Sequence, residues 1–236
     1  MSTSAKVTAR QRIENLLDDN SFVEIGAYVK ARNTDFNIQA KDTPSDGVIT
    51  GYGVINGGLV YVYSQDASVL GGSVGEMHAK KIASLYDMAM KTGSPVIGLI
   101  DSTGLRLQES VDGLNAFGQI YMKQSLASGV IPTVTAIFGN CGGGLSIVAG
   151  LSDFTFMEVE NAQLFVNSPN AITENRKEIC DNASAKFQSE EAGNVDFVGT
   201  EAEVIEGIRN LVSVLPSNNE DEASDLECYD DLNRAA

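Results

Sequence analysis

The sequence predicts an α/β fold in which helices connect the parallel strands of a wound sheet. Two observations lead to this prediction. The runs 95–100 and 133–138 are almost wholly apolar, as is typical of strands buried on both faces. Predicted strand ends at Asp66, Asp101 and Gly139 follow one another at intervals of about one strand–helix crossover. We therefore expect repeated strand–helix units, and a spiral is one arrangement that would hold them.

Length and composition indicate one folded domain. The chain has 236 residues, of which 43% are hydrophobic and 20% charged, as in an ordinary globular protein. We predict a domain over 1–215 and an acidic tail over 216–236, because Pro216 follows the last helical pattern and acidic residues dominate beyond it. The acids of this tail are Glu220, Asp221, Glu222, Asp225, Glu227, Asp230 and Asp231.

Charge and cysteine usage exclude several classes of function. A net charge of -16 repels the phosphates of nucleic acids, so we expect no nucleic-acid partner. The N-terminus lacks the apolar segment of a signal peptide, and a cytoplasmic protein is expected. The three cysteines are widely spaced without a CxxC pair, which predicts neither a disulfide framework nor a metal site.

The amino-terminal part is predicted to be antiparallel. Thr8 with Gln11 three residues later fits a capping box, so a helix is expected over 8–18. Asn56 and Gly57 accept positive φ at both turn positions, which is a strong hairpin signal. The strands that precede and flank this turn are expected at 22–29, 48–55 and 59–64.

Beyond the hairpin, helical periodicity alternates with short apolar runs, which indicates parallel strands and crossover helices. The predicted elements are a helix over 75–91, a strand over 95–100, a helix over 111–127, a strand over 133–138, a helix from about Gly143, a strand over 153–157 and a helix over 202–215. The polar stretch 167–182 gives no assignment.

The first candidate site is the glycine segment 139–144, which leads from a buried strand into an apolar helix. Glycines allow a ligand to approach the backbone, and the first helical turn presents N–H groups without intrahelical acceptors. Such a segment can stabilise an oxyanion. Tight packing of strand against helix explains the small residues equally well.

A second glycine turn, around Gly104, follows the preceding strand. Loops at the carboxyl ends of parallel strands share one crevice, so N–H groups from both segments can face one carbonyl oxygen, as an enolate requires. Arg106 in this turn can pair with a phosphate or a carboxylate of a ligand, and a surface ion pair is the alternative interpretation.

A third turn contains Gly71-Gly72-Ser73-Val74-Gly75, which matches the nucleophile elbow of serine hydrolases. The match is weak, because the turn does not follow directly from its strand and His78, the only histidine, lies on the same predicted helix. We predict instead that Ser73 caps that helix.

Six segments in series resemble the N-terminal, acyl-CoA-binding domain of biotin-dependent acyl-CoA carboxylase carboxyltransferases. They are 46–53, 63–66, 71–78, 101–109, 127–132 and 139–144, and the resemblance covers roughly 7–219. It implies the α/β fold of the crotonase superfamily (ClpP/crotonase), a spiral of β-β-α units. Backbone N–H pairs in such proteins hold a thioester enolate or the ureido oxygen of biotin.

The resemblance also implies roles for individual residues. Gly143 and Gly144, with Gly104 and Leu105, are the expected catalytic residues, and no metal is expected. The residues implied in cofactor binding are Arg106, Gly71, Gly72 and Ser73. Thr103 and Leu105 stand where family members commonly carry glycine and alanine. Which N–H pair serves the thioester and which serves biotin stays open.

The function implied is that of one subunit of a heteromeric carboxyltransferase or decarboxylase, which moves a carboxyl group between carboxybiotin and an acyl-CoA. Expected partners are a second carboxyltransferase subunit, a biotin carboxyl carrier protein and further copies of the chain. One alternative is a malonate-decarboxylase-type subunit that acts on a carrier-bound acyl thioester. Another is an assembly subunit without catalysis, which the residues at 103 and 105 keep open. The acyl group and the direction of transfer also stay open.

Overall fold

The computed structural model describes residues 7–32, 42–168, 181–221 and 229. One mixed sheet forms the centre of the fold, with the strand order β1-β2-β3-β4-β5-β6-β8 and with β7 paired to β5. The strands are β1 Val23–Ile25, β2 Val48–Ile55, β3 Gly58–Gln65, β4 Val96–Ser102, β5 Thr133–Gly142, β6 Phe154–Glu158, β7 Gln163–Phe165 and β8 Phe197–Gly199. The α-helices are α1 Ala9–Leu16, α2 Glu76–Thr92, α3 Ser110–Ala127, α4 Gly144–Gly150, α5 Ala185–Glu190 and α6 Glu201–Val214.

The antiparallel start is confirmed. Thr8 and Gln11 form both hydrogen bonds of the capping box at the start of α1. Asn56 and Gly57 have φ of 50° and 87°, so they form the tight turn that joins β2 to β3. The strand predicted over 22–29 is shorter than expected: β1 ends before Gly26, whose φ of 72° is incompatible with an extended strand.

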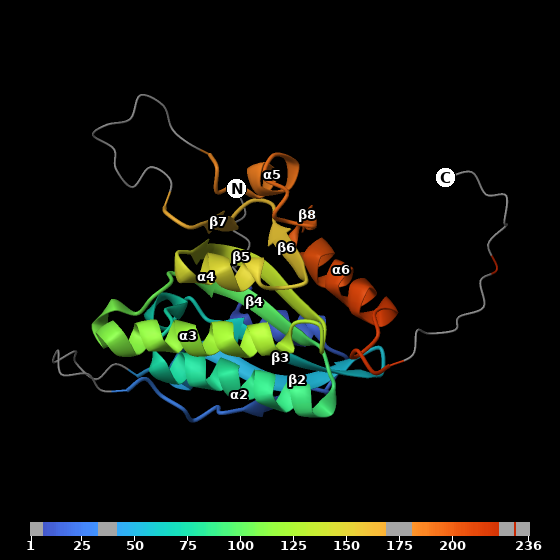
Figure 1. Ribbon diagram of the computed structural model, residues 1–236, viewed down its shortest axis with the longest axis horizontal. Helices are drawn as coiled ribbons and strands as arrows, with labels where there is room; N and C mark the ends of the chain where they lie inside the picture. The colour runs from blue at the N-terminus through green and yellow to red at the C-terminus, as the bar shows by residue number, and fades with distance from the viewer. Residues whose placement is uncertain (1–6, 33–41, 169–180, 222–228, 230–236) are drawn as a thin grey trace.

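The parallel half follows the predicted units. The pairs β3–β4, β4–β5, β5–β6 and β6–β8 are all parallel. Helices α2, α3 and α4 pack side by side on one face of the sheet (Figure 1). Helices α1 and α6 pack together on the other face. The α/β prediction is therefore confirmed.

Side chains of β3 alternate between two cores, as the period of a strand requires. Tyr61 and Tyr63 point towards α2 and α3, while Val60 and Val62 point towards α1 and α6. Both faces of the central strands are covered, which explains why their sequences are nearly continuous apolar runs.

Further strand-like pairing occurs near the carboxyl ends of the parallel strands. Val74 pairs with Leu105 in a parallel bridge, and Ser102 pairs with Cys141. Strand β5 extends four residues past the predicted end at 138 because its last residues pair with β7. Each unit thus consists of a strand, a short strand-like segment and a helix, which is the β-β-α pattern of the expected spiral.

The chain stays attached to the domain beyond the predicted boundary at 215. Asn218 donates its side-chain amide to Gly93 O at 3.0 Å, and the Asn219 N–H donates to Val130 O at 2.9 Å. Most of the tail predicted over 216–236 lies outside the described residues, as do Cys180, Cys228 and most of the unassigned stretch 167–182. In the described part of the chain, no helix has the length and apolarity to span a bilayer.

Candidate active site

The loops that follow β3 and β4 are joined by main-chain hydrogen bonds. The Thr103 N–H donates to Gly71 O at 2.9 Å, the Val74 N–H to Gly104 O at 2.8 Å, and the Arg106 N–H to Val74 O at 2.9 Å. These bonds make one structure of the second and third glycine turns. The two loops therefore form one continuous wall at the carboxyl ends of the parallel strands.

Ser102 joins the two loops of this wall through its hydroxyl group. Its hydroxyl donates to Gly72 O at 2.6 Å and accepts from the Gly104 N–H at 3.1 Å. The end of β5 lies directly against it, since a Cβ at Gly104 would be 3.4 Å from Gly142 O. The segments around residues 71, 104 and 143, recognised separately in the sequence, are thus brought together.

The glycine segment at the start of α4 is held from two sides. The Gly143 N–H donates to Phe165 O of β7 at 3.0 Å. Tyr121 of α3 donates its hydroxyl to Gly144 O at 2.7 Å, and a Cβ at Gly144 would lie 2.7 Å from the same hydroxyl oxygen. Close approach of α3 therefore requires glycine at position 144.

Two of the four predicted backbone donors are already used within the fold. The Gly104 N–H donates to Ser102 and the Gly143 N–H to Phe165. Among the described residues, the N–H groups of Leu105 and Gly144 have no hydrogen-bond acceptor. One N–H from each of two adjoining segments is thus left without an acceptor within the described fold.

The two departures from the family pattern are accommodated by glycines opposite them. Leu105 is half-buried and packs against Gly113 of α3, where a Cβ would approach its Cδ1 to 2.9 Å. Thr103 is exposed and contacts Gly71 in the same way, at 2.9 Å from a Cβ there. Both side chains therefore fit without moving the backbone that carries the donors.

Arg106 is not part of a surface ion pair. Its side chain is 4% exposed, and Nη1 lies 2.7 Å from Asp46 Oδ1 and 2.8 Å from Glu109 Oε1. Nε donates to Ser73 Oγ at 3.2 Å and Nη2 to Ser73 O at 2.7 Å. The predicted contact of Arg106 with a ligand stays a prediction, but most of its donors face its own chain.

The prediction that Ser73 caps a helix is wrong. The N-cap of α2 is Gly75, and no side chain bonds to the first turn from that position. Ser73 instead ends a short 3₁₀ turn, Leu70–Gly72, which places it two residues before the cap. Its hydroxyl accepts from Arg106, a contact between residues far apart in the sequence.

Gly71 and Gly72 allow the loop to approach the end of β4 closely. A Cβ at Gly72 would lie 2.5 Å from Asp101 O, a distance that no real side chain tolerates. Both glycines and Ser73 therefore lie at the same edge of the sheet as the donors. Their implied role in cofactor binding stays a prediction.

His78 does not act as a base for Ser73, because both of its ring nitrogens bond to other residues. It is fully buried, with Nδ1 3.0 Å from Asp46 O and Nε2 3.1 Å from the side-chain nitrogen of Gln65. Nδ1 therefore carries the proton and donates to Asp46 O, and Gln65 donates to Nε2. Burial, with smaller effects of neighbouring cations, lowers the pKa of His78 to about 3, so the ring is neutral at pH 7. The serine-hydrolase alternative has no support in this geometry.

Asp46 is a residue whose place local patterns did not reveal. It belongs to a turn in which Ser45, Asp46 and Gly47 all have positive φ, and its Oδ2 accepts from the His78 N–H at 2.8 Å. Burial raises the pKa of this carboxyl group, and Arg106 opposes that rise. The only local signal was the turn-forming Asp46-Gly47 pair. No cluster of three or more potential metal ligands occurs among the described residues.

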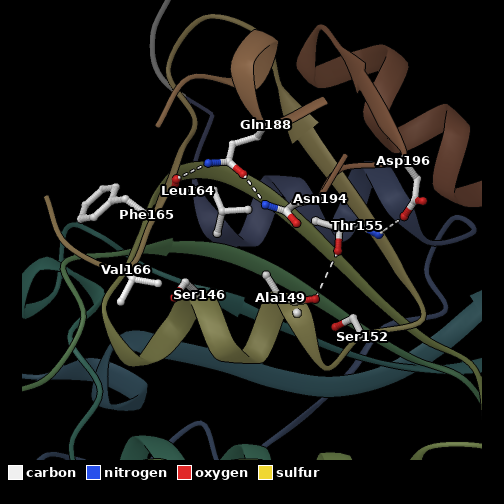
Figure 2. Close-up of a pocket in the computed structure, with 11 residues that line it drawn as sticks. Ser146, Ala149, Ser152, Thr155, Leu164, Phe165, Val166, Gln188, Asn194 and Asp196 are labelled. Atoms are coloured by element: carbon white, nitrogen blue, oxygen red, sulfur yellow. Dashed lines mark hydrogen bonds between the residues drawn. The ribbon is translucent and has the colours of Figure 1, made fainter. Parts of the chain in front are cut away.

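A pocket of about 370 Å³ lies between α4, β7 and α5 (Figure 2). Its polar side chains are bonded mainly to the fold: Gln188 donates to Leu164 O at 3.1 Å and accepts from Asn194 at 2.9 Å. Phe165 lines the pocket and accepts the Gly143 N–H, so the pocket adjoins the glycine segment. The lining residues are Ser146, Ala149, Gly150, Ser152, Thr155, Leu164, Phe165, Val166, Gln188, Asn194 and Asp196.

Comparison with known proteins identifies the family. The model of the carboxyl transferase domain matches residues 2–236. This chain belongs to the carboxyl transferase domain family. Methylmalonyl-CoA decarboxylase subunit alpha of Propionigenium modestum is 44% identical over 98% of the chain and 45% of its own length. The propionyl-CoA carboxylase beta chain of Roseobacter denitrificans is 40% identical over 97% of the chain and 46% of its own length. The chain spans about half the length of these relatives.

Solved structures agree with this assignment. The transcarboxylase 12S hexamer with bound methylmalonyl-coenzyme A is 38% identical, with a TM-score of 0.86 over 92% of the chain and 43% of that protein. A Pseudomonas malonate decarboxylase hetero-tetramer in complex with malonate is 25% identical, with a TM-score of 0.76 over 88% of the chain and 81% of its matched subunit. The expected α/β crotonase-like fold and the family resemblance are confirmed.

Proposed function

We propose that this chain is the acyl-CoA-binding subunit of a biotin-dependent carboxyltransferase or decarboxylase. It moves a carboxyl group between carboxybiotin and an acyl-CoA, and the N–H groups of Leu105 and Gly144 bind the thioester oxygen. The observation that carries the proposal is that two adjoining loops each leave one backbone donor without an acceptor. The close relatives named above support acyl-CoA as the substrate class.

The chemistry needs backbone donors rather than a nucleophile. When the carboxyl group leaves or joins the carbon next to the thioester, negative charge develops on the thioester oxygen. Donors already directed at that oxygen stabilise the transition state, by about 2.7–4 kcal/mol for each one removed in comparable sites. An uncharged leucine and a glycine can supply this, because the main chain carries the donors.

One available pair of donors fits one oxyanion. The pair formed by Leu105 and Gly144 is therefore assigned to the thioester, and the ureido oxygen of biotin is assigned to donors of a second carboxyltransferase subunit. Biotin would arrive on a separate carrier protein. A cytoplasmic location belongs to the same proposal.

An apolar stripe on α3 supports a protein partner beside the site. The exposed fractions of Val111, Leu114 and Leu126 are 72%, 62% and 57%, and their spacing places them on one side of the helix. Leu107, just after the Arg106 turn, is also 76% exposed. A second carboxyltransferase subunit seated there would lie next to the donors and exclude water from them.

The malonate-decarboxylase alternative has weaker support, because that relative is less similar than the acyl-CoA enzymes. The two hypotheses predict different thioester substrates. In the decisive experiment, the chain is co-expressed with the carboxyl-terminal half of the Propionigenium modestum relative and supplied with a biotinylated carrier. Decarboxylation of methylmalonyl-CoA with transfer to biotin supports the proposal. Turnover of malonyl-carrier thioester alone favours the alternative, and formation of a complex without either reaction favours the assembly subunit.

A further inference from the structure

We infer that Arg106 is a positioning residue, which holds the 104–105 peptide so that the Leu105 N–H faces the substrate oxygen. The inference rests on the proposed function and adds the residue that fixes the donor. The Arg106 cluster comprises Arg106, Asp46, Glu109 and Ser73, and Arg106 directly follows that peptide in the chain.

The direction of the Leu105 N–H follows from its own peptide plane. Gly104 C=O accepts the Val74 N–H at 2.8 Å, and the C=O and N–H of a trans peptide point in opposite directions. The Leu105 N–H therefore points away from Val74. Any shift of Val74 relative to Gly104 rotates this donor.

Arg106 holds Val74 in place through both its main chain and its side chain. Its main-chain N–H donates to Val74 O at 2.9 Å, and its side chain donates twice to Ser73, the residue before Val74. Of the five N–H groups of a guanidinium, four thus have partners when Asp46 and Glu109 are included. The side chain connects three loops, and only one of its N–H groups is left to bind a ligand.

The carboxylates of the cluster are fixed in turn. Asp46 Oδ2 accepts the His78 N–H at 2.8 Å, and Glu109 Oε2 accepts the Glu76 N–H at 2.6 Å. Each carboxylate therefore connects Arg106 to the first turn of α2. A lysine offers a point charge without the planar fork, so it cannot reach all of these acceptors at once.

The test compares Arg106→Met and Arg106→Lys with Arg209→Lys, a control in an ion pair outside the site. Each variant is studied as the full chain and in the reconstituted complex. The readouts are kcat and KM for methylmalonyl-CoA, and the hydrogen exchange of the Val74 amide compared with Ile97 in β4. We expect Arg106→Met to expose the Val74 amide to exchange, to lower kcat roughly 100-fold and to change KM less than about threefold. Arg106→Lys should restore only part of kcat, and the control should match wild type.

Unchanged Val74 exchange in a folded Arg106→Met chain, or unchanged kcat despite faster exchange, would overturn the inference. If Arg106→Met does not fold, Glu109→Gln takes its place, because it weakens one bond of the cluster and should lower kcat roughly tenfold. Wild-type kcat for Glu109→Gln would also overturn it. If the wild-type complex transfers no carboxyl group, the proposed function fails, while amide exchange still decides whether Arg106 holds the loop.

Discussion

Ser73 contributes one neutral acceptor to a buried guanidinium, and its main-chain oxygen remains when the hydroxyl is removed. Ser73→Ala should therefore lower the free energy of unfolding by about 1–2 kcal/mol and reduce carboxyl transfer less than about tenfold. Urea denaturation and steady-state rates of the complex measure both quantities. A loss of more than about 100-fold with an intact fold would return Ser73 to consideration as a nucleophile.

Gly144 offers a direct test of a main-chain donor. Gly144→Ala and Gly144→Pro both introduce a Cβ against Tyr121, so both should lose stability, but only proline removes the N–H. Position 144 is the first residue of α4, where proline is compatible with a helix. We expect transfer by the proline variant to be roughly 100-fold slower than by the alanine variant, at similar acyl-CoA affinity. Equal rates would place the active site elsewhere.

His78 makes stability depend on pH. Its pKa is lowered from 6.5 to about 3 in the fold. Below pH 6.5 the ring therefore binds a proton in the unfolded chain but stays neutral in the native chain. The stability is fully present above pH 6.5 and is lost as the pH falls towards 3. Between pH 6.5 and 4 the free energy of unfolding should fall by about 3 kcal/mol, at about 1.4 kcal/mol per pH unit. Urea titrations of wild type and His78→Asn should differ in this slope, and equal slopes would contradict a buried neutral ring.

At the scale of elements, the sequence predicted well wherever the signal was local. The Asn56-Gly57 turn predicted the hairpin, and the continuous apolar runs predicted most of the buried strands β4 and β5. The last part of β5 was missed because it depends on pairing with β7, more than twenty residues later. The sequence indicated the right glycine segments, but not which N–H groups are available, since that depends on Ser102 and Phe165 as acceptors.

Strand β7 fixes the Gly143 peptide, and α5 holds β7. Gln188 donates to Leu164 O at 3.1 Å and to Asn182 O at 2.7 Å, as Figure 2 shows for the first of these bonds. Gln188→Ala leaves buried carbonyl oxygens without donors, which should cost about 1–3 kcal/mol. Exchange of the Leu164 amide should quicken, while that of Ile97 should not. Gln188→Glu keeps the shape of the side chain and removes the same donor, so it should also quicken the exchange of the Leu164 amide, and wild-type exchange in both variants would contradict this role of Gln188.

At the scale of the molecule, carboxyl transfer needs two sets of donors, and we assign one to this chain. The purified chain should therefore form oligomers and bind acyl-CoA, yet gain carboxyl transfer only when a second carboxyltransferase subunit is added. Light scattering and a decarboxylation assay with free biotin test this expectation. Decarboxylation of methylmalonyl-CoA by the chain alone would contradict it. Leu114→Glu on the exposed face of α3 serves as the control that should weaken the complex without unfolding the chain.

The main-chain nature of the donors reverses what an alanine scan of this protein would report. Leu105→Ala keeps the N–H group, so a residue that we propose to bind the substrate oxygen would score as neutral. Arg106→Ala removes the hydrogen bonds that we infer to hold that peptide, so a residue that acts through another residue would score as essential. A map of the active site drawn from side-chain deletions would therefore be displaced from the reacting atoms by one shell of residues.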